Sequence, residues 1–151
     1  MPKFFEFAAR HWTLFLALGA VLVLLLGNEV QRWLRGLKKV GPLEAVQLIN
    51  HRNALILDVR SDGEFKDGHI PHARHMPLEG LKTTATQLAK FKDRPVVVYC
   101  RTGSRSARAG SLLRAQGFED IFNLDGGILA WQTANLPVHR DQKDLKGKQT
   151  G

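Results

Sequence analysis

One cysteine occupies a position from which it can act as a nucleophile. Cys100 follows a β-branched run at 95–99 and opens the loop CRTGSR, residues 100–105, which leads into a helical pattern. Gly103 permits a tight curve in this loop, and Ser104 is suited to cap the helix that follows. Backbone N–H groups of such a loop converge beside the positive end of the helix, where they favour thiolate over thiol. We therefore predict that Cys100 attacks an anionic substrate as a thiolate.

The rest of the loop forms the predicted binding set for that substrate, in which two arginines supply positive charge and paired N–H donors. The set comprises Arg101, Thr102, Gly103, Ser104 and Arg105. A cation at a helix start opposes the helix dipole, so Arg105 indicates a functional requirement. Two structural alternatives stay open: Cys100 as a small buried apolar residue, and Arg101 as a solvated surface charge.

Loop length distinguishes two chemistries that use this kind of loop, phosphoryl transfer and sulfur transfer. Cysteine-dependent phosphatases need a longer spacing, in which the arginine would fall at Ser106. Here four residues separate Cys100 from Arg105. A smaller ring of donors fits a sulfur atom better than a tetrahedral phosphate, so the spacing favours sulfur transfer.

Short apolar runs alternate with helical patterns behind this loop. Runs at 54–58, 95–99 and 120–124 are typical of buried strands, and 83–91 and 104–116 of helices. Such alternation predicts an α/β fold with a central parallel sheet and helices on both faces. Ligands bind such sheets at the carboxyl ends of the strands, where Cys100 emerges. Asp58 and Arg60 end another strand near the same edge.

The N-terminal segment is apolar on all sides. No charged residue interrupts the stretch from Trp12 to Asn28, which as a helix would be roughly 25 Å long, against about 30 Å for a bilayer core. We predict an N-terminal transmembrane helix within residues 1–28, touching lipid through 7–28, and a basic linker at 29–41. A buried core helix and a cleaved signal peptide are the alternatives, but no small-x-small cleavage site follows the run.

Basic residues predict the orientation of this anchor. The four on its C-terminal side outnumber the two on its N-terminal side, which places the domain in the cytoplasm of a bacterial inner membrane. They are Arg32, Arg35, Lys38 and Lys39 against Lys3 and Arg10. The single cysteine excludes an intramolecular disulfide and fits a reducing compartment. Because much of the net charge of +8 is local and no nucleic-acid motif accompanies it, we expect no nucleic-acid partner.

Four ordered motifs resemble the rhodanese family: LILDVR at 55–60, EFKDGHIPHA at 64–73, the loop at 100–105, and LDGGILAW at 124–131. The resemblance covers about residues 40–137. It implies a rhodanese-like domain at 42–137, and the polar stretch 138–151 is expected to be a flexible tail. Anchor and domain together resemble a bacterial class of membrane-associated, single-domain members. The family usually has glycine where this chain has His72.

The resemblance implies a sulfurtransferase without a metal or organic cofactor. Sulfane sulfur would move from a small anionic donor such as thiosulfate to Cys100, and from the persulfide to a thiol or other thiophilic acceptor. It also implies that Asp58 and Arg60 support the loop by hydrogen bonds. The alternative is a membrane-tethered binding module that recruits a protein, including a membrane protein. We expect no metal site at His69, His72 and His75, since Pro71 and Pro77 argue against a helix that would align them.

Overall fold

The computed structural model describes residues 11–34 and 37–140, with side chains from 28 to 34 left out. The chain divides into two compact units, Met1–Gly36 and Leu37–Gly151. In the first unit, helix α2 spans Trp12–Leu34, so the apolar segment is helical as predicted. Within the described part of the chain, we find no helix with the length and apolarity that crossing a membrane requires. This finding does not support the predicted membrane-spanning helix.

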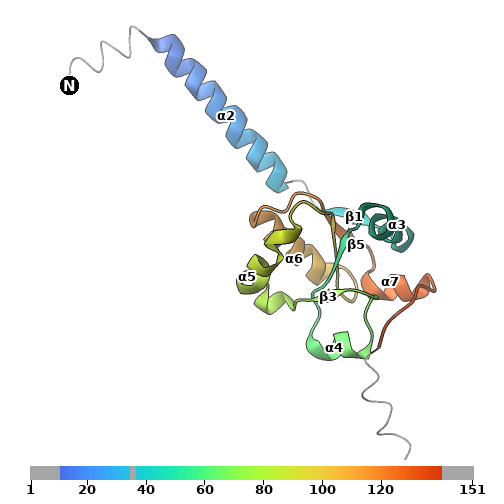
Figure 1. Cartoon of the computed structure of the whole chain (residues 1–151). Coiled ribbons are helices and arrows are strands. Elements are labelled where there is room, and N and C mark those ends of the chain that lie inside the picture. Colours follow the sequence, from blue (N-terminus) through green and yellow to red (C-terminus); the bar gives the residue numbers. More distant parts are fainter. Residues whose placement is uncertain (1–10, 35–36, 141–151) are drawn as a thin grey trace, which may run out of the picture. The chain divides into compact units, whose positions relative to one another are not determined.

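The second unit is built on a five-stranded sheet in which every pairing is parallel (Figure 1). The strand order is β1-β5-β4-β2-β3. The strands are β1 Lys38–Val40, β2 Leu55–Asp58, β3 Arg74–His75, β4 Val96–Tyr99 and β5 Ile121–Leu124. The three central strands are buried along their whole length, as apolar runs covered on both faces must be. The predicted α/β class with a parallel sheet is therefore confirmed.

Helices cover both faces of this sheet, as predicted. Leu57 faces a core with Leu81, Leu88 and Leu113 of α5, η2 and α6, whereas its neighbour Ile56 faces a second core with residues of α3 and α7. Figure 1 shows the two groups of helices on opposite sides of the strands. The helices are α3 Pro42–Arg52, α4 Asp62–Asp67, η1 Leu78–Gly80, α5 Leu81–Thr84, η2 Ala85–Phe91, α6 Ser104–Ala115 and α7 Gly127–Thr133.

Strand β1 lies inside the segment predicted as a linker. It pairs with β5 at the sheet edge, and only Val40 of its residues is buried. Three residues with two exposed lysines carry no readable period, so the sequence pattern could not reveal this strand.

The start of the predicted tail is also ordered. His139 exchanges two backbone hydrogen bonds with His69, with N···O distances of 2.9 and 2.8 Å, and Val138 packs against the second core. The flexible tail predicted from residue 138 is therefore wrong for 138–140, because these backbone groups pair with a distant segment. The rest of that prediction, together with Lys3, Arg10 and Arg35, lies outside the described residues.

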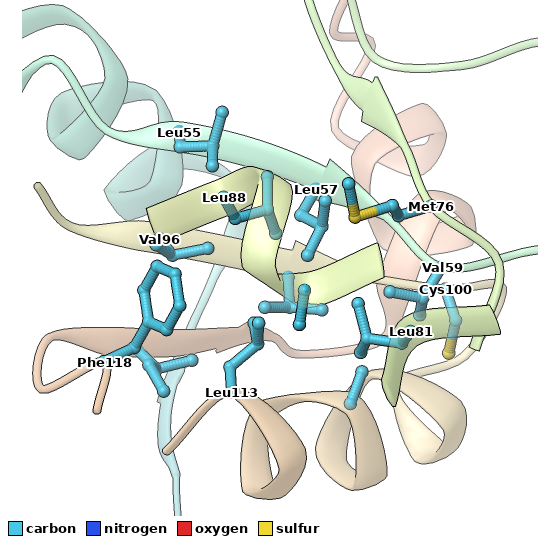
Figure 2. Packing of buried hydrophobic residues seen from close by; sticks show 14 residues of the cluster. Leu55, Leu57, Val59, Met76, Leu81, Leu88, Val96, Cys100, Leu113 and Phe118 are labelled. Carbon is cyan, nitrogen blue, oxygen red and sulfur yellow. The ribbon is translucent and has the colours of Figure 1, made fainter. Parts of the chain in front are cut away.

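Parallel pairing brings the carboxyl ends of the strands to one edge of the sheet. Strand β4 leads directly into Cys100, which lies at one end of the first core near Leu81 (Figure 2). The neighbouring strands β2 and β5 end at Asp58 and Leu124. This edge therefore gathers segments that are far apart in the sequence around the cysteine.

Candidate active site

The thiol of Cys100 is buried and accepts hydrogen bonds from its own loop. The residue is 1% exposed, and its Sγ lies 3.1 Å from the backbone N of Gly103 and 3.5 Å from the hydroxyl of Ser106. Burial raises the pKa of Cys100, but hydrogen bonds from the Ser106 hydroxyl and from the N–H groups of Ser106, Gly103 and Thr102 outweigh it. The net effect is a lowered pKa, as the sequence predicted from the loop.

The loop turns at Gly103, where the backbone adopts φ 109° immediately before α6. This left-handed conformation favours glycine. Gly103 therefore caps the helix and Ser104 is its first residue, so the prediction that Ser104 is the N-cap is wrong by one position. The turn directs the Gly103 N–H toward Sγ, while its carbonyl accepts from the backbone of Ala107 at 3.2 Å.

Two buried polar side chains, Ser106 and Asn123, support the loop by hydrogen bonds to it. The Ser106 hydroxyl lies 2.6 Å from Oδ1 of Asn123, and 3.0 Å from the carbonyl of Gly103. The Asn123 amide also donates to that carbonyl at 3.0 Å. A hydroxyl has one hydrogen, so Cys100 Sγ, Gly103 O and Asn123 Oδ1 are alternative acceptors for Ser106. This pair was not predicted from the sequence, where the available signal is a polar residue, Asn123, within a buried strand.

The first turn of α7, which begins at Gly127, also supports the loop. The backbone N–H groups of Ile128 and Leu129 donate to the carbonyls of Cys100 and Arg101, at 2.9 and 3.4 Å. Gly127 lies against the same carbonyls with φ 57°, and a Cβ there would stand 2.5 Å from Arg101 O and closer still to Cys100 O. The turn therefore needs glycine for its conformation and for its close approach to the catalytic loop.

Arg105 is held by an acidic residue that the sequence analysis did not single out. Its Nη1 and Nη2 donate to the two carboxylate oxygens of Glu64 at 2.8 and 2.7 Å. Oε2 of Glu64 also accepts from the backbone N and the hydroxyl of Ser61, at 3.2 and 3.0 Å. Hydrogen bonds from Arg105, acting against burial, hold the pKa of Glu64 at about 2. The arginine is therefore engaged in a two-pronged ion pair rather than free for a substrate.

The other predicted binding residues lie at the exposed side of the loop. Arg101, Thr102 and Ser104 are exposed, whereas Gly103 is half-buried. Within the described part of the chain, the Arg101 side chain has no hydrogen bond or ion pair. Arg101 is thus the loop cation that stays available to an incoming anion.

Asp58 and Arg60 form a buried pair at the end of β2. The guanidinium donates to both carboxylate oxygens, with Nη2 2.6 Å from Oδ2, and to the carbonyl of Gly68 at 2.8 Å. It also lies 5.5 Å above the ring centre of Tyr99. Neither side chain donates to or accepts from residues 100–105. The pair contacts Tyr99, which precedes Cys100, and does not make the hydrogen bonds to the loop that the resemblance implies.

The three histidines at 69, 72 and 75 take separate roles. His69 stacks on Phe65 with 3.8 Å between ring centres, and Nε2 of His75 hydrogen-bonds to the carbonyl of Arg60 at 2.9 Å. His72 adopts φ 62°, a conformation that favours glycine. Among the described residues, no group of His, Cys, Asp and Glu side chains could hold a metal ion.

The chain is similar to several known bacterial proteins. The protein YibN of Escherichia coli K12 is 31% identical over 141 residues, which cover 93% of this chain and 99% of YibN. A protein of Allochromatium vinosum named sulfurtransferase is 37% identical over 92 residues, or 61% of this chain and 84% of that protein. The thiosulfate sulfurtransferase GlpE of Shewanella oneidensis is 38% identical over 61% of this chain and 89% of its own.

The fold matches solved structures of the same kind. The crystal structure of a rhodanese-related protein from Thermoplasma volcanium matches with a TM-score of 0.62 and 27% identity, over 69% of this chain and 99% of that one. The sequence model of the rhodanese-like domain matches residues 42–134, which is more than half of the chain. With the loop geometry and these matches together, the protein belongs to the rhodanese-like domain family.

Proposed function

We propose that this protein is a sulfurtransferase that moves sulfane sulfur through a persulfide on Cys100. The observation that carries the proposal is the buried Sγ with the N–H of Gly103 at 3.1 Å and the Ser106 hydroxyl at 3.5 Å. These donors favour a thiolate and then suit the negative charge of the terminal persulfide sulfur. Relatives named sulfurtransferase and thiosulfate sulfurtransferase support the same chemistry.

The proposed reaction has two displacement steps. With thiosulfate as donor, the Cys100 thiolate attacks the outer sulfur, a new S–S bond forms, and sulfite leaves with the electron pair of the broken bond. A thiolate or another thiophilic acceptor then attacks the terminal persulfide sulfur and releases the Cys100 thiolate. The chain has one cysteine, so the acceptor must come from outside it.

Mass spectrometry of the full chain tests this proposal. Incubation with thiosulfate should add the mass of one sulfur atom, and cyanide should remove it as thiocyanate. The Cys100→Ser variant should show neither the adduct nor the transfer. Because Cys100 is the only cysteine, an adduct needs no mapping among thiols. Full transfer activity in the serine variant would show that Cys100 is not the nucleophile.

We also propose that α2 attaches the protein to the bacterial inner membrane with Cys100 on the cytoplasmic side, beside membrane-protein partners. Support comes from the large apolar side chains of α2 between Trp12 and Gly27, which are 45% to 72% exposed. Exposed apolar surface of this extent is typical of lipid or protein contact. The four basic residues after the apolar run support the orientation.

Carbonate washing and thiol labelling test the attachment. The full chain should remain with the membrane after a carbonate wash. A membrane-impermeant thiol reagent should label Cys100 only after lysis, and the lysed sample controls for the burial of the thiol. Release by carbonate would contradict attachment through α2, and labelling in spheroplasts would reverse the orientation.

A further inference from the structure

We infer that Glu64 is a specificity-determining residue: by neutralising Arg105, it makes the site select sulfur donors with one negative charge over the thiosulfate dianion. The inference rests on the proposed sulfur transfer and adds the class of donor to it. Thiosulfonates (R–SO2–S⁻) and persulfide anions (R–S–S⁻) belong to the favoured class. The evidence is the contact between helix α4 and the start of helix α6.

The contact fixes both partners in position. Each carboxylate oxygen of Glu64 accepts a hydrogen bond from one guanidinium nitrogen of Arg105, at 2.8 and 2.7 Å. Oε2 also accepts from the backbone N–H and the hydroxyl of Ser61. The carboxylate therefore accepts hydrogen bonds from two residues, and its pKa of about 2 keeps it ionised at neutral pH. A planar two-pronged pair is the most specific geometry that arginine forms. Two N–H groups of the Arg105 guanidinium therefore donate to Glu64 and are not available to a substrate.

Of the two arginines in the loop at 100–105, one has no partner among the described residues. The hydrogen bonds that Arg105 donates to Glu64 are the largest reason why the pKa of Arg105 is raised. Burial opposes this rise, and the negative charges of Glu64, Cys100 and Glu79 add to it. Arg105 thus lies within electrostatic reach of the nucleophile, yet Glu64 offsets its charge. Arg101, exposed and unpaired among the described residues, is the remaining cation. One free cation matches a monoanion better than a dianion.

The chemistry with a monoanionic donor balances in the same way as with thiosulfate. The Cys100 thiolate attacks the sulfane sulfur of a thiosulfonate, the new S–S bond forms, and a sulfinate leaves with the electrons of the broken S–S bond. Both donors are attacked by the same thiolate. A change in the reactivity of Cys100 therefore cancels in the ratio of kcat/KM for thiosulfate to kcat/KM for methanethiosulfonate.

Four forms of the full chain test the inference through that ratio: wild type, Glu64→Gln, Arg105→Gln, and the double variant. The net charge of positions 64 and 105 together is zero in the wild type, positive in Glu64→Gln, negative in Arg105→Gln and zero in the double variant. At the dielectric of water, a unit charge about 4 Å from the donor changes the ratio by about fivefold, and a lower dielectric in the loop enlarges the change. The ratio should rise in Glu64→Gln, fall in Arg105→Gln, and return to the wild-type value in the double variant. Glutamine at position 64 keeps the hydrogen bond that caps α4.

Asp62→Asn provides the matched control, because it removes the same charge from the same helix without touching Arg105. Its ratio should equal that of the wild type. An equal ratio in all four forms, a fall in Glu64→Gln, or the same rise in Asp62→Asn would overturn the role of Glu64. If the wild type formed no persulfide with either donor, the proposed function would fail, and this inference with it.

Discussion

Replacing Gly127 by alanine should disable the catalytic loop while leaving the domain folded. The added Cβ would stand 2.5 Å from the carbonyl oxygen of Arg101 and closer to that of Cys100, both of which are backbone atoms that cannot rotate away. Carbon and oxygen normally keep about 3.3 Å apart, so one of the two segments must move by roughly 0.8 Å. Because Ile128 N and Cys100 O are joined by a hydrogen bond of 2.9 Å, the movement reaches the nucleophile.

The expected losses follow from this displacement. An L residue at φ 57° costs about 1 to 2 kcal/mol, and overpacking adds about 1 to 3 kcal/mol, partly offset by the lower entropy of the unfolded chain. We expect a loss of about 2 to 4 kcal/mol in the free energy of unfolding. A displacement near 1 Å in a catalytic group costs about a hundredfold in rate. The kcat/KM for thiosulfate should fall by that factor.

Gly126→Ala is the matched control. Gly126 also has a positive φ of 72°, but its added Cβ would meet the Cβ of Ala130 at 2.7 Å and not the loop. Both variants should lose stability in urea denaturation, and only Gly127→Ala should lose most of its sulfur transfer at a temperature where both are folded. Equal activity in the two folded variants would refute the reasoning that the Gly127 turn holds the loop in place.

Three further predictions concern single interactions. Ser106→Ala removes a hydrogen bond to Sγ, so the pKa of Cys100 should rise and the thiolate fraction at neutral pH should fall, as measured by thiolate absorbance across pH; an unchanged titration would contradict this role. His72→Gly relieves φ 62° and should raise the free energy of unfolding by about 0.5 to 1 kcal/mol, whereas a loss would show that His72 makes compensating contacts. The pKa of Glu64 is about 2 when folded, below its ordinary value of 4.5, so its contribution to stability is complete above pH 4.5 and is lost as the pH falls toward 2. Denaturation curves across that range should show a weaker acid dependence for Glu64→Gln than for wild type, and parallel curves would count against the ion pair.

Local patterns in the sequence determined the fold class and the nucleophile. Fully apolar runs such as Val96–Tyr99, alternating with helical patterns, are typical of strands buried on both faces, and the sheet is parallel with helices on each side. The tight loop after that strand placed Cys100 at the carboxyl edge, because strand, turn and helix follow one another directly in the chain. The fold class and the position of Cys100 depend on residues that are adjacent in the chain, so they can be predicted from the sequence.

Tertiary structure alone decided which groups surround the nucleophile. Glu64 and Arg105 are 41 residues apart, and Ser106 and Asn123 are 17 apart, so no local period relates them. The sequence assigned Arg105 to the substrate, whereas the tertiary structure gives it a carboxylate partner, Glu64 of α4. The charge that a substrate meets depends on such pairings, which form only when separate elements pack together. Residue types and spacing determined what this loop contains, and the packing of α4, β5 and α7 around it decided which of its charges and donors remain free.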